Sequence, residues 1–164
     1  MEFISKSTEE TAQIASNFTK TILEKSDLAK SATVVGLYGE LGSGKTTFMK
    51  YLAKAFGIEE IIQSPTFVIE KIYDLTPNPS PCEGEGRKKE EIFHKLIHID
   101  AYRIETAGEM LNLGWSEIIA DPQNLIFIEW PEKIQSIMPP HIVIKFEHGH
   151  KESERKIVIN DVKK

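Results

Sequence analysis

One string of eight residues constrains this chain more than any other feature of its sequence. Positions 39–46 read Gly-Glu-Leu-Gly-Ser-Gly-Lys-Thr, which matches the pattern G-x-x-x-x-G-K-[S/T]. The glycines let the backbone curl so that successive N–H groups converge on one point, and a helix that follows directs its positive end at the same point. The string therefore predicts a strand, a phosphate-binding loop and a helix, in that order.

The residues on both sides of the loop meet this requirement. Residues 33–38 form a short, largely β-branched apolar run, which is typical of a buried parallel strand. After the loop, Phe48, Leu52 and Phe56 recur at helical spacing, and Gly57 supplies a helix stop. A glycine-rich surface turn with an exposed lysine would not need these flanks. We therefore predict that the loop binds a nucleoside triphosphate through Gly39, Glu40, Leu41, Gly42, Ser43, Gly44, Lys45 and Thr46.

Length and composition narrow the class of protein. The chain has 164 residues, 40% of them hydrophobic, which is enough for one sheet between helices, so we expect residues 1–164 to form one domain. The formal net charge of −5 argues against a broad nucleic-acid-binding surface. A single cysteine, Cys82, excludes an internal disulfide. No apolar stretch approaches the ~18 residues of a membrane span, and we expect a soluble, cytoplasmic protein without membrane contact.

The rest of the sequence alternates between helical and strand patterns. This alternation predicts an α/β fold with a mostly parallel sheet flanked by helices and a C-terminal β-hairpin. Helices are expected at 7–25, at 105–120 with a bend at Gly114, and at 131–138. Strands are expected at 66–73, 96–100 and 124–129, and the hairpin at 142–146 and 156–159.

Residues 74–91 differ from the rest of the chain in composition. Prolines alternate with small polar residues, and two glycines lead into the basic run 87–89. Such a segment has little apolar surface to bury, so it is predicted to be a flexible insert. The alternative is a lid whose basic residues reach the phosphates.

Two acids stand at strand ends. Asp100 and Glu129 each close an apolar strand, and ligands of an open parallel sheet lie beyond those ends. We therefore predict that both face the loop. Lys45, Asp100 and Glu129 are the expected catalytic residues, with Thr46, Asp100 and Glu129 around Mg²⁺. Two roles remain open for Glu129, contact with the ion through water or polarisation of an attacking water, and Asp100 alone could be a turn former.

Other candidate residues have simpler interpretations. His98 lies between two isoleucines, which favours a packed or exposed histidine over a ligand. The pair His148 and His150 lacks the spacing and the further ligands of a zinc site. Trp130 follows Glu129 and either borders the nucleotide or belongs to the core.

Several short strings together resemble one family. They are Gly39 to Thr47, Ser-Pro-Thr-Phe at 64–67, His-Ile-Asp-Ala-Tyr-Arg at 98–103, Leu113-Gly114 with Glu117, and Ile-Glu-Trp-Pro-Glu-Lys at 128–133. In this order and at this length the chain resembles the bacterial TsaE family, formerly YjeE, the ATPase of tRNA threonylcarbamoyladenosine biosynthesis. The likeness runs from about residue 7 to 160 apart from the insert.

The resemblance implies a P-loop NTPase-type fold that binds ATP with Mg²⁺ and hydrolyses it slowly alone. It implies association with a TsaB–TsaD complex. The acidic charge balance predicts only indirect or weak contact with tRNA, and we expect a monomer in isolation. It also implies that Thr47, Thr66 and Trp130 join the nucleotide site, with Thr66 in a switch-like segment, and that Glu129 is the essential Walker B-like acid. Glu40 departs from the Asp common in the family.

Two other classes of protein share the loop. A small-molecule or nucleoside kinase would need an acceptor pocket and usually a lid with several arginines, and the middle of this chain has only Arg87 and Arg103. A nucleotide-gated binding module would bind ATP without needing its hydrolysis. A GTPase is disfavoured because no Asn-Lys-x-Asp string occurs.

Overall fold

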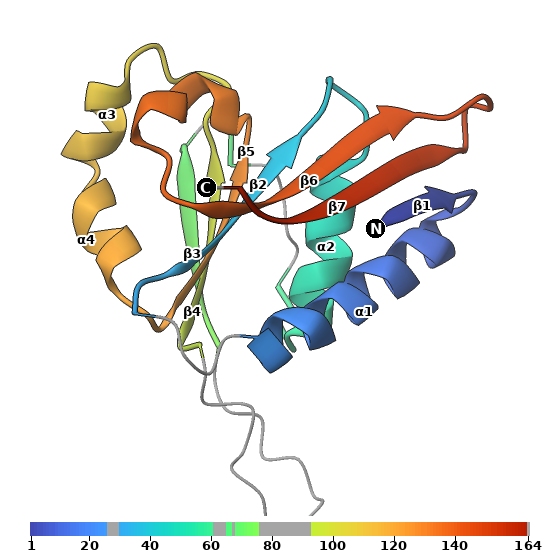
Figure 1. Ribbon diagram of the computed structural model, residues 1–164, viewed down its shortest axis with the longest axis horizontal. Helices are drawn as coiled ribbons and strands as arrows, with labels where there is room; N and C mark the ends of the chain where they lie inside the picture. Colours follow the sequence, from blue (N-terminus) through green and yellow to red (C-terminus); the bar gives the residue numbers. More distant parts are fainter. Residues whose placement is uncertain (26–29, 61–64, 67, 76–92, 164) are drawn as a thin grey trace, which may run out of the picture.

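The computed structural model describes residues 1–25, 30–60, 65–66, 68–75 and 93–163 (Figure 1). These residues form one sheet of seven strands in the order β1-β7-β6-β2-β5-β4-β3. The strands are β1 (Glu2–Ser5), β2 (Thr33–Tyr38), β3 (Glu70–Asp74), β4 (Lys95–Asp100), β5 (Asn124–Glu129), β6 (His141–His148) and β7 (Arg155–Lys163). The helices are α1 (Thr8–Lys25), α2 (Lys45–Ala55), α3 (Ala107–Asn112), α4 (Trp115–Ala120) and the 3-10 helix η3 (Pro131–Ile137).

The sheet is parallel at its centre and antiparallel at its edges. Strands β4, β5, β2 and β6 are parallel neighbours, and this confirms the predicted sheet. Strand β7 pairs antiparallel with β6, which confirms the C-terminal hairpin, and β3 pairs antiparallel with β4. Strand β1, which was not predicted, adds to β7. The C-terminal ends of β2, β4 and β5 therefore lie at one edge of the sheet. The phosphate loop begins at the end of β2, and Asp100 and Glu129 are the last residues of β4 and β5.

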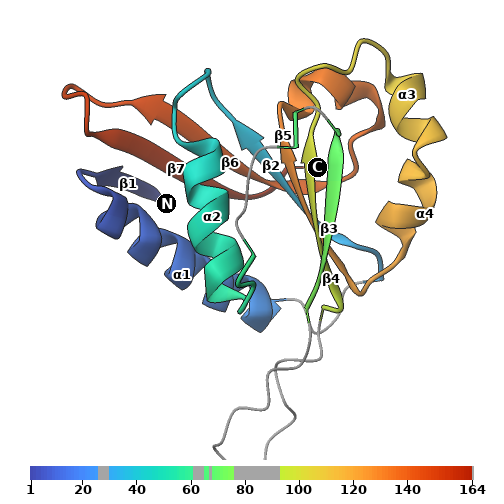
Figure 2. The same ribbon diagram turned by 180° about the vertical axis from the view of Figure 1, so that it is seen from behind.

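Helices cover both faces of the sheet (Figures 1 and 2). On one face, α1 and α2 pack over a core that includes Phe18, Phe48 and Phe127. On the other face, a second core around Met110 and Trp115 separates the sheet from α3, α4 and η3. Every residue of β5 is buried, as expected for a central strand covered on both sides. The two cores hold the strand ends in fixed positions.

The local signals read from the sequence account for most element boundaries. Ser7 Oγ accepts the Glu10 N–H at 3.3 Å and starts α1. Gly114, with φ of 81°, separates α3 from α4 and confirms the predicted bend. None of the helices in the described part of the chain is both long and apolar enough to cross a membrane.

The strand predicted at 66–73 begins later than expected, at Glu70. Among the described residues of this segment, the N–H groups of Val68 and Ile69 donate to the Pro65 carbonyl and form a turn before β3. Ile69 has φ of 67°, which a strand cannot contain, and its carbonyl accepts the Asp100 N–H at 2.8 Å. The turn thus carries Thr66 to the end of β4. Residues 64, 67 and 76–91, including nearly all of the predicted insert, lie outside the described residues.

Candidate nucleotide-binding site

The phosphate loop connects β2 to α2 and curls as the sequence predicted. Gly39 has φ of 145°, and a Cβ atom there would lie 2.4 Å from the Phe146 carbonyl oxygen. Only glycine fits at such an approach, because the hairpin strand β6 passes directly beside the loop. The Ser43 hydroxyl is buried and has no hydrogen-bond partner among the described residues. It is a polar group that a ligand in the loop could satisfy.

Lys45 is folded into the loop. Its ammonium donates to the carbonyl oxygens of Gly39 at 2.6 Å and Glu40 at 2.9 Å, and it lies 4.1 Å from the centre of the Trp130 ring. Burial lowers the pKa of this ammonium, and the carboxylates of Glu129 and two other acids oppose the shift. A cation held mainly by neutral groups is a strong electrostatic attractor for an anion.

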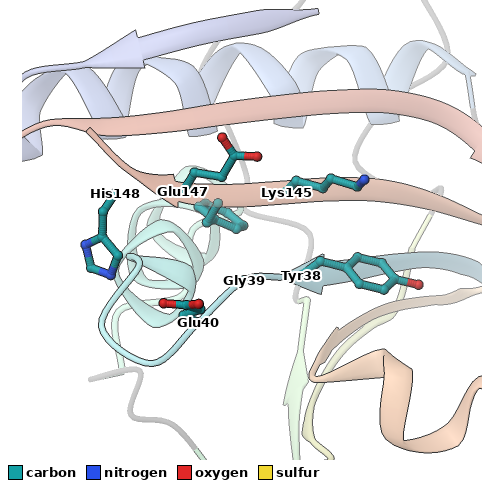
Figure 3. Close-up of a pocket in the computed structure, with 7 residues that line it drawn as sticks. Tyr38, Gly39, Glu40, Lys145, Glu147 and His148 are labelled. Carbon is teal, nitrogen blue, oxygen red and sulfur yellow. The ribbon is translucent and has the colours of Figure 1, made fainter. Parts of the chain in front are cut away.

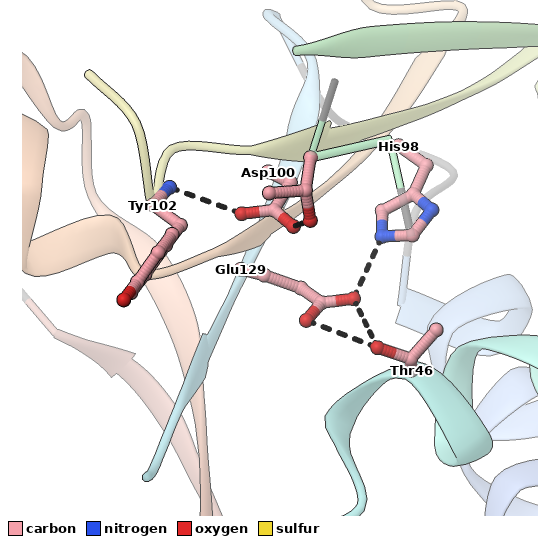
Figure 4. Close-up of polar contacts among 6 residues, drawn as sticks. Thr46, His98, Asp100, Tyr102 and Glu129 are labelled. Carbon is pink, nitrogen blue, oxygen red and sulfur yellow. Dashed lines mark hydrogen bonds and ion pairs between the residues drawn. The ribbon is translucent and has the colours of Figure 1, made fainter. Parts of the chain in front are cut away.

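The two predicted acids lie side by side. Asp100 and Glu129 are register partners on β4 and β5, and both side chains are buried. The Glu129 carboxylate accepts a hydrogen bond from the Thr46 hydroxyl, with distances of 3.0 and 3.2 Å to its two oxygens (Figure 4). The first turn of α2 is therefore joined to the end of β5. Three predicted site residues, Thr46, Asp100 and Glu129, therefore lie together beside the phosphate loop.

Asp100 brings a fourth predicted residue into this group. One of its carboxylate oxygens accepts the Tyr102 N–H at 3.0 Å, and the other accepts a hydrogen bond from the Thr66 hydroxyl (Figure 4). The turn before β3 is thus fixed to the end of β4. We call Thr46, Thr66, His98, Asp100 and Glu129 the acid cluster.

His98 is the member of the acid cluster that sequence reasoning did not select. It is completely buried, and its Nε2 lies 3.0 Å from a Glu129 oxygen, so the imidazole N–H donates to the carboxylate (Figure 4). Its Nδ1 has no hydrogen-bond partner among the described residues. His98 is packed, as expected, but the group that it contacts is Glu129, the acid predicted to be essential. The strand period of two, which puts His98 and Asp100 on one face, was the available signal.

Trp130 lies at the site and also touches the core. It has φ of 60° and ψ of 47°, an uncommon backbone conformation for a bulky residue. Its ring covers the Lys45 ammonium, lies 5.1 Å from the Tyr102 ring, and packs against the second core. Both sequence interpretations of this residue therefore describe part of its surroundings.

The remaining loop residues face outward or away from the acid cluster. Glu40 and Leu41 are exposed, and Leu41 is 79% accessible. Glu40 lines one cavity beside the loop, of about 390 Å³, together with His148 (Figure 3). Thr47 lines another cavity, of about 410 Å³. No group of three or more His, Cys, Asp or Glu side chains suited to a metal occurs among the described residues, and His148 forms no such group.

A phosphate loop before a helix, with two buried acids at the ends of neighbouring parallel strands, defines the P-loop NTPase type of protein. Comparison with protein families narrows this class. The family model described as threonylcarbamoyl adenosine biosynthesis protein TsaE matches residues 5–157. The chain belongs to the TsaE family.

Individual relatives support the same assignment. The following three are each named tRNA threonylcarbamoyladenosine biosynthesis protein TsaE. The one from Borreliella burgdorferi is 35% identical over 123 residues, which is 75% of each chain. The one from Bacillus subtilis is 37% identical over 120 residues, covering 71% of this chain and 64% of the relative. The Treponema pallidum protein is 31% identical over 143 residues, 87% of each chain.

A solved structure has the same fold. The crystal structure of Bacillus subtilis YdiB superimposes with a TM-score of 0.67 at 27% identity, covering 99% of this chain and 86% of that one. The predicted α/β fold and the predicted family are both confirmed.

Proposed function

We propose that this chain is an ATP-hydrolysing accessory subunit of the machinery that makes threonylcarbamoyladenosine in tRNA. Family membership supports the pathway, because the relatives carry that biosynthetic name. The observation that carries the enzymatic part is the contact of Glu129 with Thr46 at the mouth of the phosphate loop. It joins an acid suited to hydrolysis to the helix that receives the phosphates.

The loop residues bind and orient the triphosphate in this proposal. Backbone N–H groups of residues 42–46 surround the phosphates, and the Ser43 hydroxyl gains the partner that it lacks among the described residues. The Lys45 ammonium exchanges the carbonyls of Gly39 and Glu40 for phosphate oxygens. Trp130 keeps water from one side of the lysine, which strengthens its attraction for the anion.

The acid cluster supplies the remaining groups. The oxygens of Thr46, Asp100 and Glu129 are the hard donors that Mg²⁺ prefers, so these residues fit a bound Mg²⁺. When bound, the ion neutralises charge that develops on the phosphates. Glu129, held by His98 and Thr46, orients the water or accepts its proton. Asp100 holds Thr66 close to the phosphates.

The partners in this proposal are a TsaB–TsaD complex, with tRNA contacted weakly or only through that complex. The net charge of −5 supports this division, because a principal tRNA-binding subunit would carry a basic surface. A role in tRNA modification implies a cytoplasmic site of action. We propose that the chain is a monomer until it meets the complex.

Phosphate release tests the proposal directly. The purified chain is assayed with ATP and Mg²⁺, alone and with the TsaB–TsaD complex, and Lys45→Ala serves as the inactive control. We expect slow release alone, faster release with the complex, and none from the variant. ATP binding without any stimulation by the complex would contradict the proposal and direct attention to a kinase or a passive binding module.

A further inference from the structure

A hydrogen-bonded pair of aromatic side chains lies beside the start of the phosphate loop. Tyr38 is the last residue of β2, and its ring is directed back along the strand, away from Glu40 (Figure 3). Its hydroxyl oxygen lies 2.8 Å from Nε2 of His141, the first residue of β6. The two rings are nearly parallel, with an angle of 20° between their planes. We call Tyr38 and His141 the tyrosine–histidine pair.

We propose that the tyrosine–histidine pair is a positioning device that holds the Trp130 ring over the Lys45 ammonium. The inference rests on the proposed function, because the cover over Lys45 affects activity only if this ammonium binds phosphate. It adds two residues, from β2 and β6, that act on the nucleotide site through Trp130.

The hydrogen bonds of the pair run in one direction. His141 is only 4% exposed, and its Nδ1 lies 2.7 Å from the Pro139 carbonyl oxygen. Because a carbonyl oxygen can only accept, Nδ1 carries the proton, and Nε2 of the neutral imidazole accepts the Tyr38 hydroxyl proton. Burial, together with the charge of Glu132, raises the pKa of the Tyr38 hydroxyl, which keeps this group a donor. Both rings are therefore fixed to the backbone that precedes β6.

The two rings fill the space beside Gly36 of β2. A Cβ atom on Gly36 would lie 2.9 Å from Cε2 of Tyr38 and 3.1 Å from Cδ2 of His141. It would also lie 3.2 Å from Cγ of Pro131, which is buried. The tyrosine–histidine pair and Pro131 therefore converge on one point of the sheet, with no room for a further side chain. Movement of either ring would open a space into which Pro131 could shift.

Pro131 connects this packing to the nucleotide site. It follows Trp130, whose φ of 60° and ψ of 47° are unfavourable for a bulky residue. Such a conformation persists only where the surrounding structure holds it. The packing at Gly36 supplies part of that support, since it limits the movement of Pro131. With Pro131 in place, the centre of the indole ring lies 4.1 Å from the Lys45 ammonium.

The position of Trp130 affects how strongly Lys45 attracts an anion. Burial lowers the pKa of the Lys45 ammonium, and the indole covers one side of that group. An ammonium with less water around it attracts an anion more strongly. If Trp130 moves away, water reaches the ammonium, and its attraction for the triphosphate weakens.

The first measurement observes Trp130 itself. The chain has two tryptophans, Trp115 and Trp130, so labelling of the full chain with 5-fluorotryptophan gives two fluorine resonances, which Trp130→Phe assigns. Without nucleotide, we expect Tyr38→Phe, which loses only the hydroxyl, to shift the Trp130 resonance and to leave that of Trp115 in place. Tyr51→Phe, at a half-buried tyrosine of α2, is the matched control and should shift neither resonance.

The second measurement is calorimetric titration with ATP and Mg²⁺. Tyr38→Phe should weaken ATP binding about three- to tenfold, and Tyr51→Phe should leave it within about twofold. In a Trp130→Ala background the loss caused by Tyr38→Phe should disappear, because the pair acts through Trp130. This double-mutant comparison separates positioning from a merely structural role, and circular dichroism checks that each variant is folded.

Gly36→Ala is a second variant, since its methyl group must displace at least one of the three side chains around it. It should also shift the Trp130 resonance. An unchanged Trp130 resonance in both Tyr38→Phe and Gly36→Ala would overturn the inference, and so would a loss of ATP affinity that is as large without Trp130 as with it. If the unaltered chain does not bind ATP, the proposed function fails, whereas the fluorine spectra still decide whether the tyrosine–histidine pair positions Trp130.

Discussion

The two sides of the phosphate loop are built in different ways. On one side His98, Asp100 and Glu129 of the acid cluster are buried, and hydrogen bonds join members of the cluster across α2, β4, β5 and the turn before β3. On the other side a cavity of about 410 Å³, the hairpin cavity, lies between the start of α1, the phosphate loop and the hairpin β6–β7, and its lining includes Phe146, several hydroxyl groups and Arg155. A closed network fixes catalytic geometry, whereas an open cavity admits a ligand. Substitutions on the first side should therefore change turnover, and those on the second side should change affinity.

The largest effect is expected for Glu129→Gln. The amide keeps the size of the side chain but cannot accept a proton or carry charge, so single-turnover hydrolysis should fall by about 10²–10³-fold. The dissociation constant of ATP should change only a few-fold. Glu24→Gln, an exposed acid at the end of α1, is the control. A loss of affinity as large as the loss of turnover would break the proposed division between the two sides.

Asp100→Asn should act mainly through Mg²⁺. The amide oxygen can still accept the Tyr102 N–H, and the amide NH2 can donate to the Thr66 hydroxyl oxygen, so the local structure is retained. The Mg²⁺ concentration for half-maximal hydrolysis should rise by about 10–100-fold. Titration of hydrolysis with Mg²⁺ measures this, and a superimposable Mg²⁺ curve would mean that Asp100 serves only to hold the turn.

His98→Ala should lower kcat about tenfold without changing KM for ATP, because His98 positions Glu129 and does not reach the ligand. His98→Gln, whose amide can donate to Glu129, should recover most of the rate. This rescue distinguishes positioning from simple packing. If both variants lose the same activity, the imidazole has a role other than holding the carboxylate.

The smallest effect is expected on stability, for a substitution at Glu70. Unlike Asp100 and Glu129, this acid lies outside the acid cluster. One of its oxygens is buried without a partner among the described residues, and burial raises the pKa of its carboxyl. The neutral form stabilises the fold fully at low pH, and this contribution is lost as the pH rises through the raised pKa. Glu70→Gln should therefore raise stability by about 1 kcal/mol at pH 8, and the gain should disappear near about pH 4. Thermal melts at the two pH values measure it, and a gain that persists at low pH would contradict the charge explanation.

The acid cluster shows what local patterns could predict. The glycine-lysine string defined the loop, and the apolar strands ending in acids placed Asp100 and Glu129 together, because parallel strands end at one edge. The contact of His98 with Glu129 also depends on the pairing of β4 with β5, which no local pattern contains. Ile69 accepts the Asp100 N–H from a distant part of the sequence, so the positive φ of Ile69 was not predictable from local propensity.

The hairpin cavity shows where local reasoning fails. Its walls come from residues near 6, 44 and 155, and only the complete sheet order brings them together. Strand β1 was missed for the same reason. Four residues beginning at Glu2 carry little periodicity, and they become a strand because β7 offers a free edge.

The pairing of β1 with β7 has a consequence for the newborn chain. Residues 2–5 pair with residues 155–158, so this edge of the sheet cannot form until residues 155–158 have emerged from the ribosome. Translation at about 5–20 residues per second puts roughly 5–20 s between synthesis of the phosphate loop and synthesis of Arg155. During that interval the nascent polypeptide has the loop but lacks one wall of the space beside it. We therefore expect the phosphate loop to reach its final geometry only after Arg155, which donates to the Gly42 carbonyl, has emerged.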